Sequence, residues 1–124
     1  MTLQTLTQKD LLSKAVFTYS ITPSSDPDFS RHQTISDKAV LNYTPNTSVL
    51  TGADEKNGIK VFIVGLCIDS RAQLSREEIP SYLAKISSEK SVEKMYAVAG
   101  RFAGKYIVIV KIDNRLWMLS LIHI

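Results

Sequence analysis

The sequence contains a single cysteine, Cys67, and only two histidines, His32 and His123. One cysteine excludes a disulfide within the chain and fits a reducing compartment, so we expect a cytoplasmic protein. His123 lies in the last six residues, which we interpret below as foreign to the protein. The remaining pair, His32 and Cys67, lacks the spacing of metal ligands, so we expect no metal site.

Long apolar runs and a strong excess of one charge are also missing. No apolar stretch approaches the roughly 20 residues of a membrane-spanning helix, and residues 1–16 lack the basic start and apolar block of a secretory signal. The 15 basic and 12 acidic residues give a net charge of +3, and no basic stripe is interleaved with aromatic residues. We therefore expect neither a membrane nor a nucleic acid among the partners.

What the sequence does contain is the composition of one globular domain. The chain has 124 residues, of which 44% are hydrophobic and 22% are charged. This balance is typical of a soluble folded protein, and the length suffices to bury a core.

The last six letters, LSLIHI, have an explanation outside protein chemistry. They match one reading frame of CTGTCTCTTATACACATC, a transposon end used in preparing sequencing libraries. We interpret residues 119–124 as translated adapter and residues 1–118 as a partial domain. The alternative is that the six residues are an ordinary apolar strand end, which their composition permits.

The pattern of the first half predicts short strands around a polar loop. A short helix is expected over 7–15, and a loop over 22–34, where proline, serine and aspartate gather. Three short strands are expected, over 16–21, 38–43 and 48–52. Asn57-Gly58 suits a tight hairpin turn, and the β-branched, apolar run over 59–69 predicts a buried strand.

The second half predicts a helix pair followed by a hairpin. Ser75 and Glu78 have the spacing of a capping box at the start of a helix over 74–87, and a second helix over 91–100 ends at Gly100. Residues 101–118 are expected to form a hairpin. The apolar face of its first strand comprises Tyr106, Val108, Val110 and Ile112. Strands, a helix pair and further strands in this order predict an α+β fold.

No residue pattern by itself names a reaction. The acidic pairs Glu77-Glu78 and Asp26/Asp28 lie at a helix start and in a polar loop, so we expect structural roles for both. Cys67 lies inside the expected buried strand, where a thiol is inert.

The order of three segments resembles the N-terminal amidotransferase domain of the asparagine synthetase family, a class II (Ntn-type) glutamine amidotransferase. Its members typically contain NGEIYN, then an SD-x-E-x-I helix, then L-x-G-x-F-A leading into a hairpin. This chain has VGLCID, SREEI and VAGRFAGKYIVIVKIDNRLWM in the same order. The resemblance covers residues 59–118, and the positions that match are Gly65, Ser75, Glu78, Gly100, Phe102 and Ala103.

The resemblance implies a layered, Ntn-hydrolase-like αββα sandwich that is incomplete at its C-terminus. It also implies a C-terminal synthetase domain as the partner of this chain. ATP and Mg²⁺ would belong to that domain, so we expect no cofactor in residues 1–118.

The residues that carry glutaminase activity in this family are replaced here. Family members use a cysteine directly after the initiator methionine as nucleophile, whereas this chain has Thr2, whose hydroxyl is the one remaining candidate. The substrate-binding Asn-Gly-Glu becomes Val64-Gly65-Leu66, and the aspartate that meets the substrate amine becomes Arg76. The resemblance therefore implies an inactive domain with a structural or regulatory role toward the synthetase domain of an amide-forming ligase.

Two other interpretations stay open. The chain could be a free-standing α+β protein-interaction module whose motif similarity is fortuitous, and a homodimer is compatible with either interpretation. A small independent hydrolase is the third, but no nucleophile, base and orienting group converge in the sequence.

Overall fold

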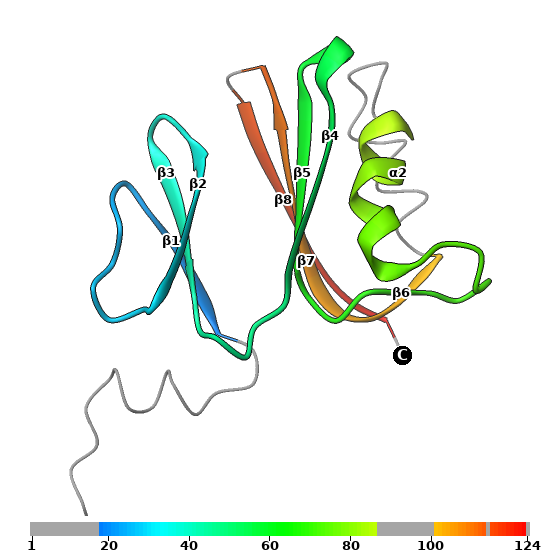
Figure 1. Cartoon of the computed structure of the whole chain (residues 1–124), viewed down its shortest axis with the longest axis horizontal. Helices are drawn as coiled ribbons and strands as arrows, with labels where there is room; N and C mark the ends of the chain where they lie inside the picture. Colours follow the sequence, from blue (N-terminus) through cyan, green and yellow to red (C-terminus); the bar gives the residue numbers. More distant parts are fainter. Residues whose placement is uncertain (1–17, 87–100, 114, 124) are drawn as a thin grey trace, which may run out of the picture. The chain divides into compact units, whose positions relative to one another are not determined.

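The computed structural model describes residues 18–86, 101–113 and 115–123, which belong to two compact units (Figure 1). The first unit ends at Thr47 and the second begins at Ser48. The helices expected over 7–15 and 91–100 lie outside the described residues, as do Thr2 and Gly100.

A three-stranded antiparallel sheet makes up the described part of the first unit. Its strands are β1 (Tyr19–Thr22), β2 (Arg31–Ser36) and β3 (Ala39–Tyr43), with β3 in the centre. The strand expected over 38–43 is confirmed as β3, and the strand expected over 16–21 overlaps β1.

The loop predicted over 22–34 is wrong at both ends, because Thr22 is the last residue of β1 and β2 includes residues 31–34. These four residues are polar and show no apolar alternation that would indicate a strand. Their backbone pairs with β3 from Arg31↔Tyr43 to Thr34↔Val40. Cross-strand hydrogen bonding therefore defines this strand, and buried Ile35 anchors its end.

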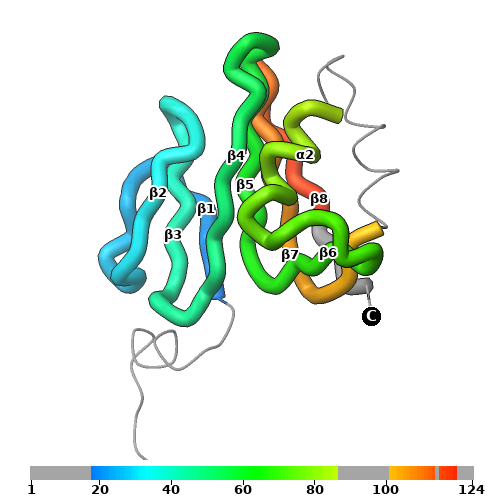
Figure 2. The backbone as a smooth tube through the Cα atoms, turned by 45° about the vertical axis from the view of Figure 1, so that its right-hand side comes forward, coloured from blue at the N-terminus to red at the C-terminus, as the bar shows by residue number. Residues whose placement is uncertain are grey.

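The second unit is built on a five-stranded antiparallel sheet. Its strands are β4 (Val49–Asp54), β5 (Ile59–Gly65), β6 (Ile68–Asp69), β7 (Phe102–Ile112) and β8 (Arg115–His123). β5 and β8 pair with the same stretch of β7, so they lie on opposite sides of this long strand (Figure 2). β6 pairs with the beginning of β7, and β4 pairs with β5.

The hairpin between β4 and β5 is confirmed, and the strand expected over 59–69 is found in two pieces. A short 3₁₀ turn, η1 (Glu55–Asn57), joins β4 to β5, and Gly58 follows it with a φ of 67°. β5 ends at Gly65, where a φ of 107° turns the chain before β6 begins at Ile68. The turn lets β6 pair with a different part of β7.

One face of this sheet packs against α2 (Ile79–Ile86), which follows the 3₁₀ turn η2 (Arg76–Glu78). The predicted capping box is confirmed, since the Glu78 carboxylate accepts the backbone N–H of Ser75 at 3.0 Å. The predicted apolar face of β7 is also confirmed as part of the core. The buried core residues are Ile59, Val61, Ile63, Cys67, Ile79, Leu83, Ala84, Phe102, Tyr106, Val108, Val110 and Ile112.

The predicted fold class, a layered α+β αββα sandwich, is wrong. The described residues are mostly strand, in two antiparallel sheets with a single short α-helix. β4, β5, β7 and β8 hydrogen-bond into one sheet, while β1, β2 and β3 form a separate one. Within the described ranges, no helix has both the length and the apolar character needed to cross a membrane.

The six-residue tail continues the ladder of β8 on β7 as far as His123. Any apolar, partly β-branched segment can extend an antiparallel ladder in this way. The pairing therefore has no bearing on our interpretation of residues 119–124 as translated adapter.

Candidate functional site

Three of the six positions on which the resemblance to the amidotransferase family rests, Gly65, Phe102 and Ala103, lie where β5 ends and β7 begins. Gly65 pairs with Tyr106, Ala103 pairs with Ile68, and Phe102 pairs with Asp69. A further backbone hydrogen bond joins the N–H of Leu66 to the carbonyl of Lys105 at 3.0 Å. The first and third motifs are thus brought together by the β-ladder, although about 35 residues separate them in the chain.

The positions at which the family's substrate-binding residues are replaced lie at this same end of β5. The backbone N–H of Gly65 donates to the carbonyl of Ser48 at 2.8 Å, and the Ser48 hydroxyl accepts a hydrogen bond from Arg76 Nη2 at 2.7 Å. Gly65 and Arg76 therefore meet through Ser48. The side chains of Val64 and Leu66 supply no hydrogen-bonding group to this end of the strand.

Cys67 lies beside this strand end with its thiol buried and neutral. Burial raises the pKa of the thiol to about 12, and the nearby charge of Arg76 only partly offsets this effect. Burial also raises the pKa of the Tyr106 hydroxyl, which donates to the carbonyl of Phe102 at 3.0 Å. Neither group is a nucleophile or a base near neutral pH, because both keep their protons.

We expect the folded protein to react with a thiol reagent at least about a hundredfold more slowly than the unfolded chain. The reason is that Cys67 is the only thiol, is fully buried and has a raised pKa. The rate of reaction with an aromatic disulfide, measured with and without denaturant, checks this. Fast stoichiometric labelling of the folded protein would show that Cys67 is accessible after all.

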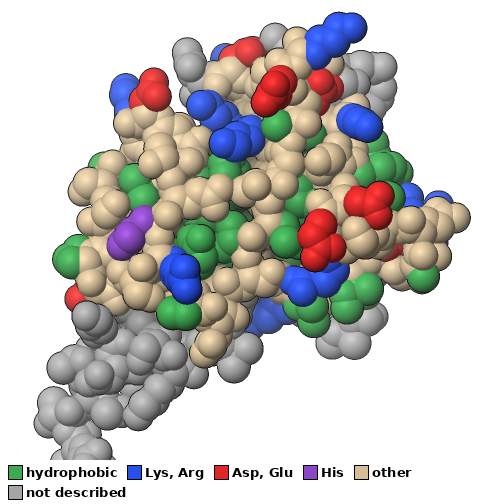
Figure 3. All heavy atoms as spheres, in the orientation of Figure 1, with side chains coloured by type: hydrophobic (Ala, Val, Ile, Leu, Met, Phe, Trp, Pro, Cys, Tyr) green, Lys and Arg blue, Asp and Glu red, His purple; other side chains and the backbone are tan. Residues whose placement is uncertain are grey.

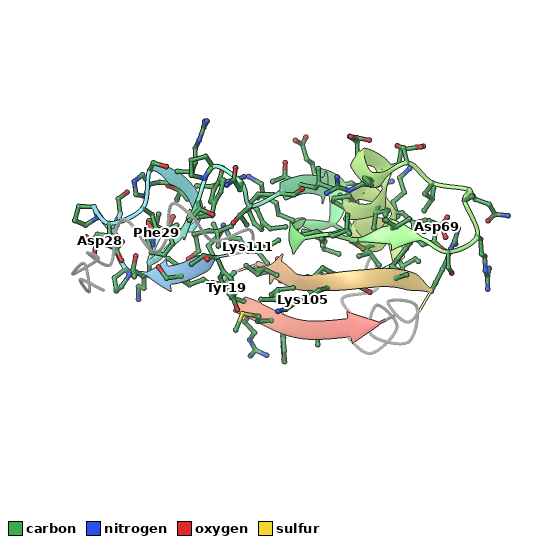
Figure 4. All side chains as sticks on the ribbon, turned by 90° about the horizontal axis from the view of Figure 1, so that it is seen from below. Tyr19, Asp28, Phe29, Asp69, Lys105 and Lys111 are labelled. Atoms are coloured by element: carbon green, nitrogen blue, oxygen red, sulfur yellow. The ribbon has the colours of Figure 1, made fainter. Side chains whose placement is uncertain are left out.

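Among the described residues of the second unit, Asp69 at the end of β6 has the polar side chain with the most hydrogen bonds (Figure 4). Its carboxylate accepts backbone N–H groups from Arg71 and Gln73 at 3.0 Å and from Leu74 at 2.9 Å. It also forms a bidentate pair with Arg101, from Nε to Oδ1 at 2.9 Å and from Nη2 to Oδ2 at 2.8 Å. The Arg101 guanidinium, followed by these backbone donors, holds the pKa of Asp69 well below its usual range.

Arg101 in turn fixes the loop to the helix. Its guanidinium donates to the hydroxyl of Tyr82 and to Oε1 of Gln73, both at 3.1 Å, and lies 5.1 Å from the centre of the Tyr82 ring. Both oxygens of Asp69 are occupied within the protein. We conclude that the Asp69–Arg101 pair is structural and not an acid or base for catalysis.

Sequence reasoning missed this pair. We assigned Asp69 to the end of an expected strand and gave its side chain no role. The signal that could have revealed it is its place before a polar loop, since an aspartate there often accepts hydrogen bonds from the backbone of the loop. Arg101 lies 32 residues away in the chain, and nothing local marks it as the partner. One side chain of each acidic pair has the structural role that we expected: Glu78 caps η2, and Asp26 Oδ1 accepts the backbone N–H of Asp28 at 2.9 Å.

A second polar cluster, which the sequence also did not reveal, is centred on Asn42 in the first unit. Asn42 is fully buried, and its side-chain oxygen accepts from His32 Nδ1 at 2.8 Å and from the backbone N–H of Asp26 at 3.0 Å. Its amide donates to the hydroxyl of Thr22 at 2.7 Å. The His32 ring lies on the surface (Figure 3). The cluster fastens the loop between β1 and β2 to the sheet.

Within the described ranges, no three histidine, cysteine, aspartate or glutamate side chains come together as a metal site.

No protein-family model matches the chain, and no match is found among curated protein sequences or among solved structures. The chemistry of the site therefore rests on the residues themselves.

Proposed function

We propose that this chain is a catalytically inactive amidotransferase-like N-terminal domain of an asparagine-synthetase-like, amide-forming protein. Its role is structural or regulatory toward a synthetase domain that uses ATP and Mg²⁺. The observation that carries the proposal is the meeting of the first and third motifs at the end of β5, with Arg76 beside them. The proposal is based on these positions and does not use the αββα fold, which the described residues do not form.

The absence of activity follows from the groups at this strand end. A glutaminase needs an activated nucleophile and donors that orient an amide, but the thiol of Cys67 is neutral and buried. Glutamine carries a positively charged α-amine, and Arg76, in place of the family's aspartate, offers that amine no acceptor. Val64 and Leu66 offer no side-chain hydrogen bond to a glutamine, so the substrate would be poorly held.

We expect no hydrolysis of L-glutamine by this chain. Ammonia and glutamate release are measured for the wild type, for Thr2→Ala, which removes the one candidate nucleophile, and for Cys67→Ser as a matched control. All three should release ammonia at the rate of buffer alone. Release by the wild type that disappears in Thr2→Ala would establish a catalytic threonine and overturn the proposal.

A second candidate function, a protein-interaction module, is favoured by one observation. Three consecutive apolar residues on β8, an outer strand that pairs only with β7 among the described strands, are largely exposed: Leu116 by 39%, Trp117 by 42% and Met118 by 56%. An apolar strand whose outer edge pairs with no other described strand is suited to pairing with another chain. The partner proposed here is a second copy of this chain.

We expect concentration-dependent self-association of the wild type in sedimentation velocity, and its loss in Trp117→Lys. A charge on this strand opposes pairing with a second copy. Arg115→Lys, which keeps the charge at the beginning of β8, serves as the control and should associate like the wild type. A monodisperse monomer that unfolds cooperatively at all concentrations would contradict association through β8.

A further inference from the structure

The two arginines that flank the end of the sheet, Arg76 and Arg101, are bound in different ways. Arg101 donates from both Nε and Nη2 to the two oxygens of the Asp69 carboxylate. Arg76 donates from Nη2 to the neutral hydroxyl of Ser48, and its Nε is buried without any hydrogen-bond partner. Arg101 and Asp69 also form an ion pair, whereas no carboxylate of the described residues pairs with Arg76.

This state of Arg76 is unfavourable for a purely structural residue. A buried donor of a charged group that lacks an acceptor loses its hydration without compensation. Arg76 is also the first residue of η2. The N-terminal end of a helical segment favours acidic side chains, so a cation is unfavourable there. Packing alone does not account for a cation at this position.

We infer that Arg76, together with Ser48, binds a carboxylate group at the end of β5. The guanidinium fork matches a planar carboxylate through Nε and Nη2, and Arg101 on Asp69 shows this geometry within the same unit. Arg76 is only partly buried, so an anion can approach the exposed part of its guanidinium. Contact with Nε, which is itself buried, requires the side chain to turn on binding. The Ser48 hydroxyl is a further donor beside it.

A monoanionic carboxylate fits this site better than a phosphate dianion. Glu77 and Glu78 follow Arg76 directly in the sequence. Asp69 is also close to the site, because its charge and that of Arg76 both act on the thiol of Cys67. These acidic groups repel a second negative charge on the ligand. The inference concerns Arg76 and Ser48 alone, so it does not depend on the proposed relationship to a synthetase.

The test follows the side-chain Nε–Hε signal of Arg76 and the backbone amide of Gly65 by NMR while sodium acetate replaces sodium chloride at constant ionic strength. We expect both signals to shift saturably at millimolar acetate. The blocked peptide acetyl-Ala-Glu-Ala-amide, titrated in the same way, shows whether the site also takes a carboxylate carried on a side chain. Inorganic phosphate should bind at least tenfold more weakly than acetate.

Three variants separate the site from general attraction of anions to a basic surface. Arg76→Gln should abolish the shift of Gly65, and Arg76→Lys, which lacks the fork, should weaken binding at least tenfold. Arg71→Gln removes an exposed positive charge five positions earlier in the chain and should bind acetate like the wild type. Thermal unfolding first establishes that each variant is folded. An absent or linear shift in the wild type, equal shifts in Arg76→Gln, or phosphate binding as tight as acetate binding would overturn the inference.

Discussion

Replacing Gly104 with alanine should destabilise the second unit by about 3 kcal/mol or more, enough to unfold a marginally stable domain. Gly104 has a φ of 123°, a conformation that residues with a Cβ rarely adopt. A Cβ at this position would also collide with the carbonyl oxygen of Leu66 and lie 3.0 Å from the carbonyl carbon of the same residue. Strain and collision thus act together at the point where the segment between β5 and β6 crosses β7.

The matched control is Gly58→Ala, at the turn between β4 and β5. Gly58 has a φ of 67°, and the one described atom that a Cβ there would meet is Asp113 Oδ1, at 3.3 Å. We expect this variant to lose about 1 kcal/mol, the ordinary cost of a left-handed conformation for a residue with a Cβ. Chemical denaturation of both variants measures the difference. Equal stabilities would show that the backbone at Gly104 does not pass so close to Leu66.

Replacing Asp69 with asparagine should cause the largest loss of stability among the polar substitutions in the second unit. Asparagine keeps one oxygen but loses the charge, so Arg101 is left partly buried without its carboxylate. The backbone N–H groups of residues 71, 73 and 74 lose an ionised acceptor. The exposed Glu77→Gln is the control and should change the unfolding midpoint little.

The same pair predicts the response of the protein to acid. The folded state lowers the pKa of Asp69, chiefly through Arg101, and lowers the pKa of Glu78 through its hydrogen bond to the backbone of Ser75. The stabilisation is therefore fully present above the unfolded pKa of about 4 and is lost as the pH falls below it. Urea unfolding across this range should show a steep acid loss for the wild type and a shallower one for Asp69→Asn. Parallel curves would exclude Asp69 as the main acid-sensitive group.

Local sequence signals predicted local structure correctly. The spacing of Ser75 and Glu78 predicted the capping box, and the alternation from Tyr106 to Ile112 predicted the face of β7 that shares a core with α2. Ile107 and Ile109, on the other face, are buried as well. Both predicted features depend only on residues a few positions apart, and a structure that depends on distant residues leaves no such local signal. β2 was missed for the same reason, since its polar residues become a strand only through pairing with β3.

The fold class and the site contacts depend on residues far apart in the chain. Periodicity shows which residues are buried but not which strands pair. The sequence pattern therefore could not distinguish the single sheet of the second unit from a layered sandwich of two sheets. The hydrogen bond from Arg76 to Ser48 spans 28 positions, and the ion pair of Asp69 and Arg101 spans 32. The sequence marked Arg76 only by a change of charge at a motif position, and it gave no sign of Ser48.

Sequencing the source DNA beyond the codon for Met118 tests the proposed origin of this chain most directly. We expect the true reading frame to depart from LSLIHI and to continue past the hairpin into a synthetase domain with a phosphate-binding Ser-Gly-Gly-x-Asp stretch. A genuine stop codon directly after Ile124 would contradict both the adapter interpretation and the assignment to a synthetase. The interaction module would then be the better account of this protein.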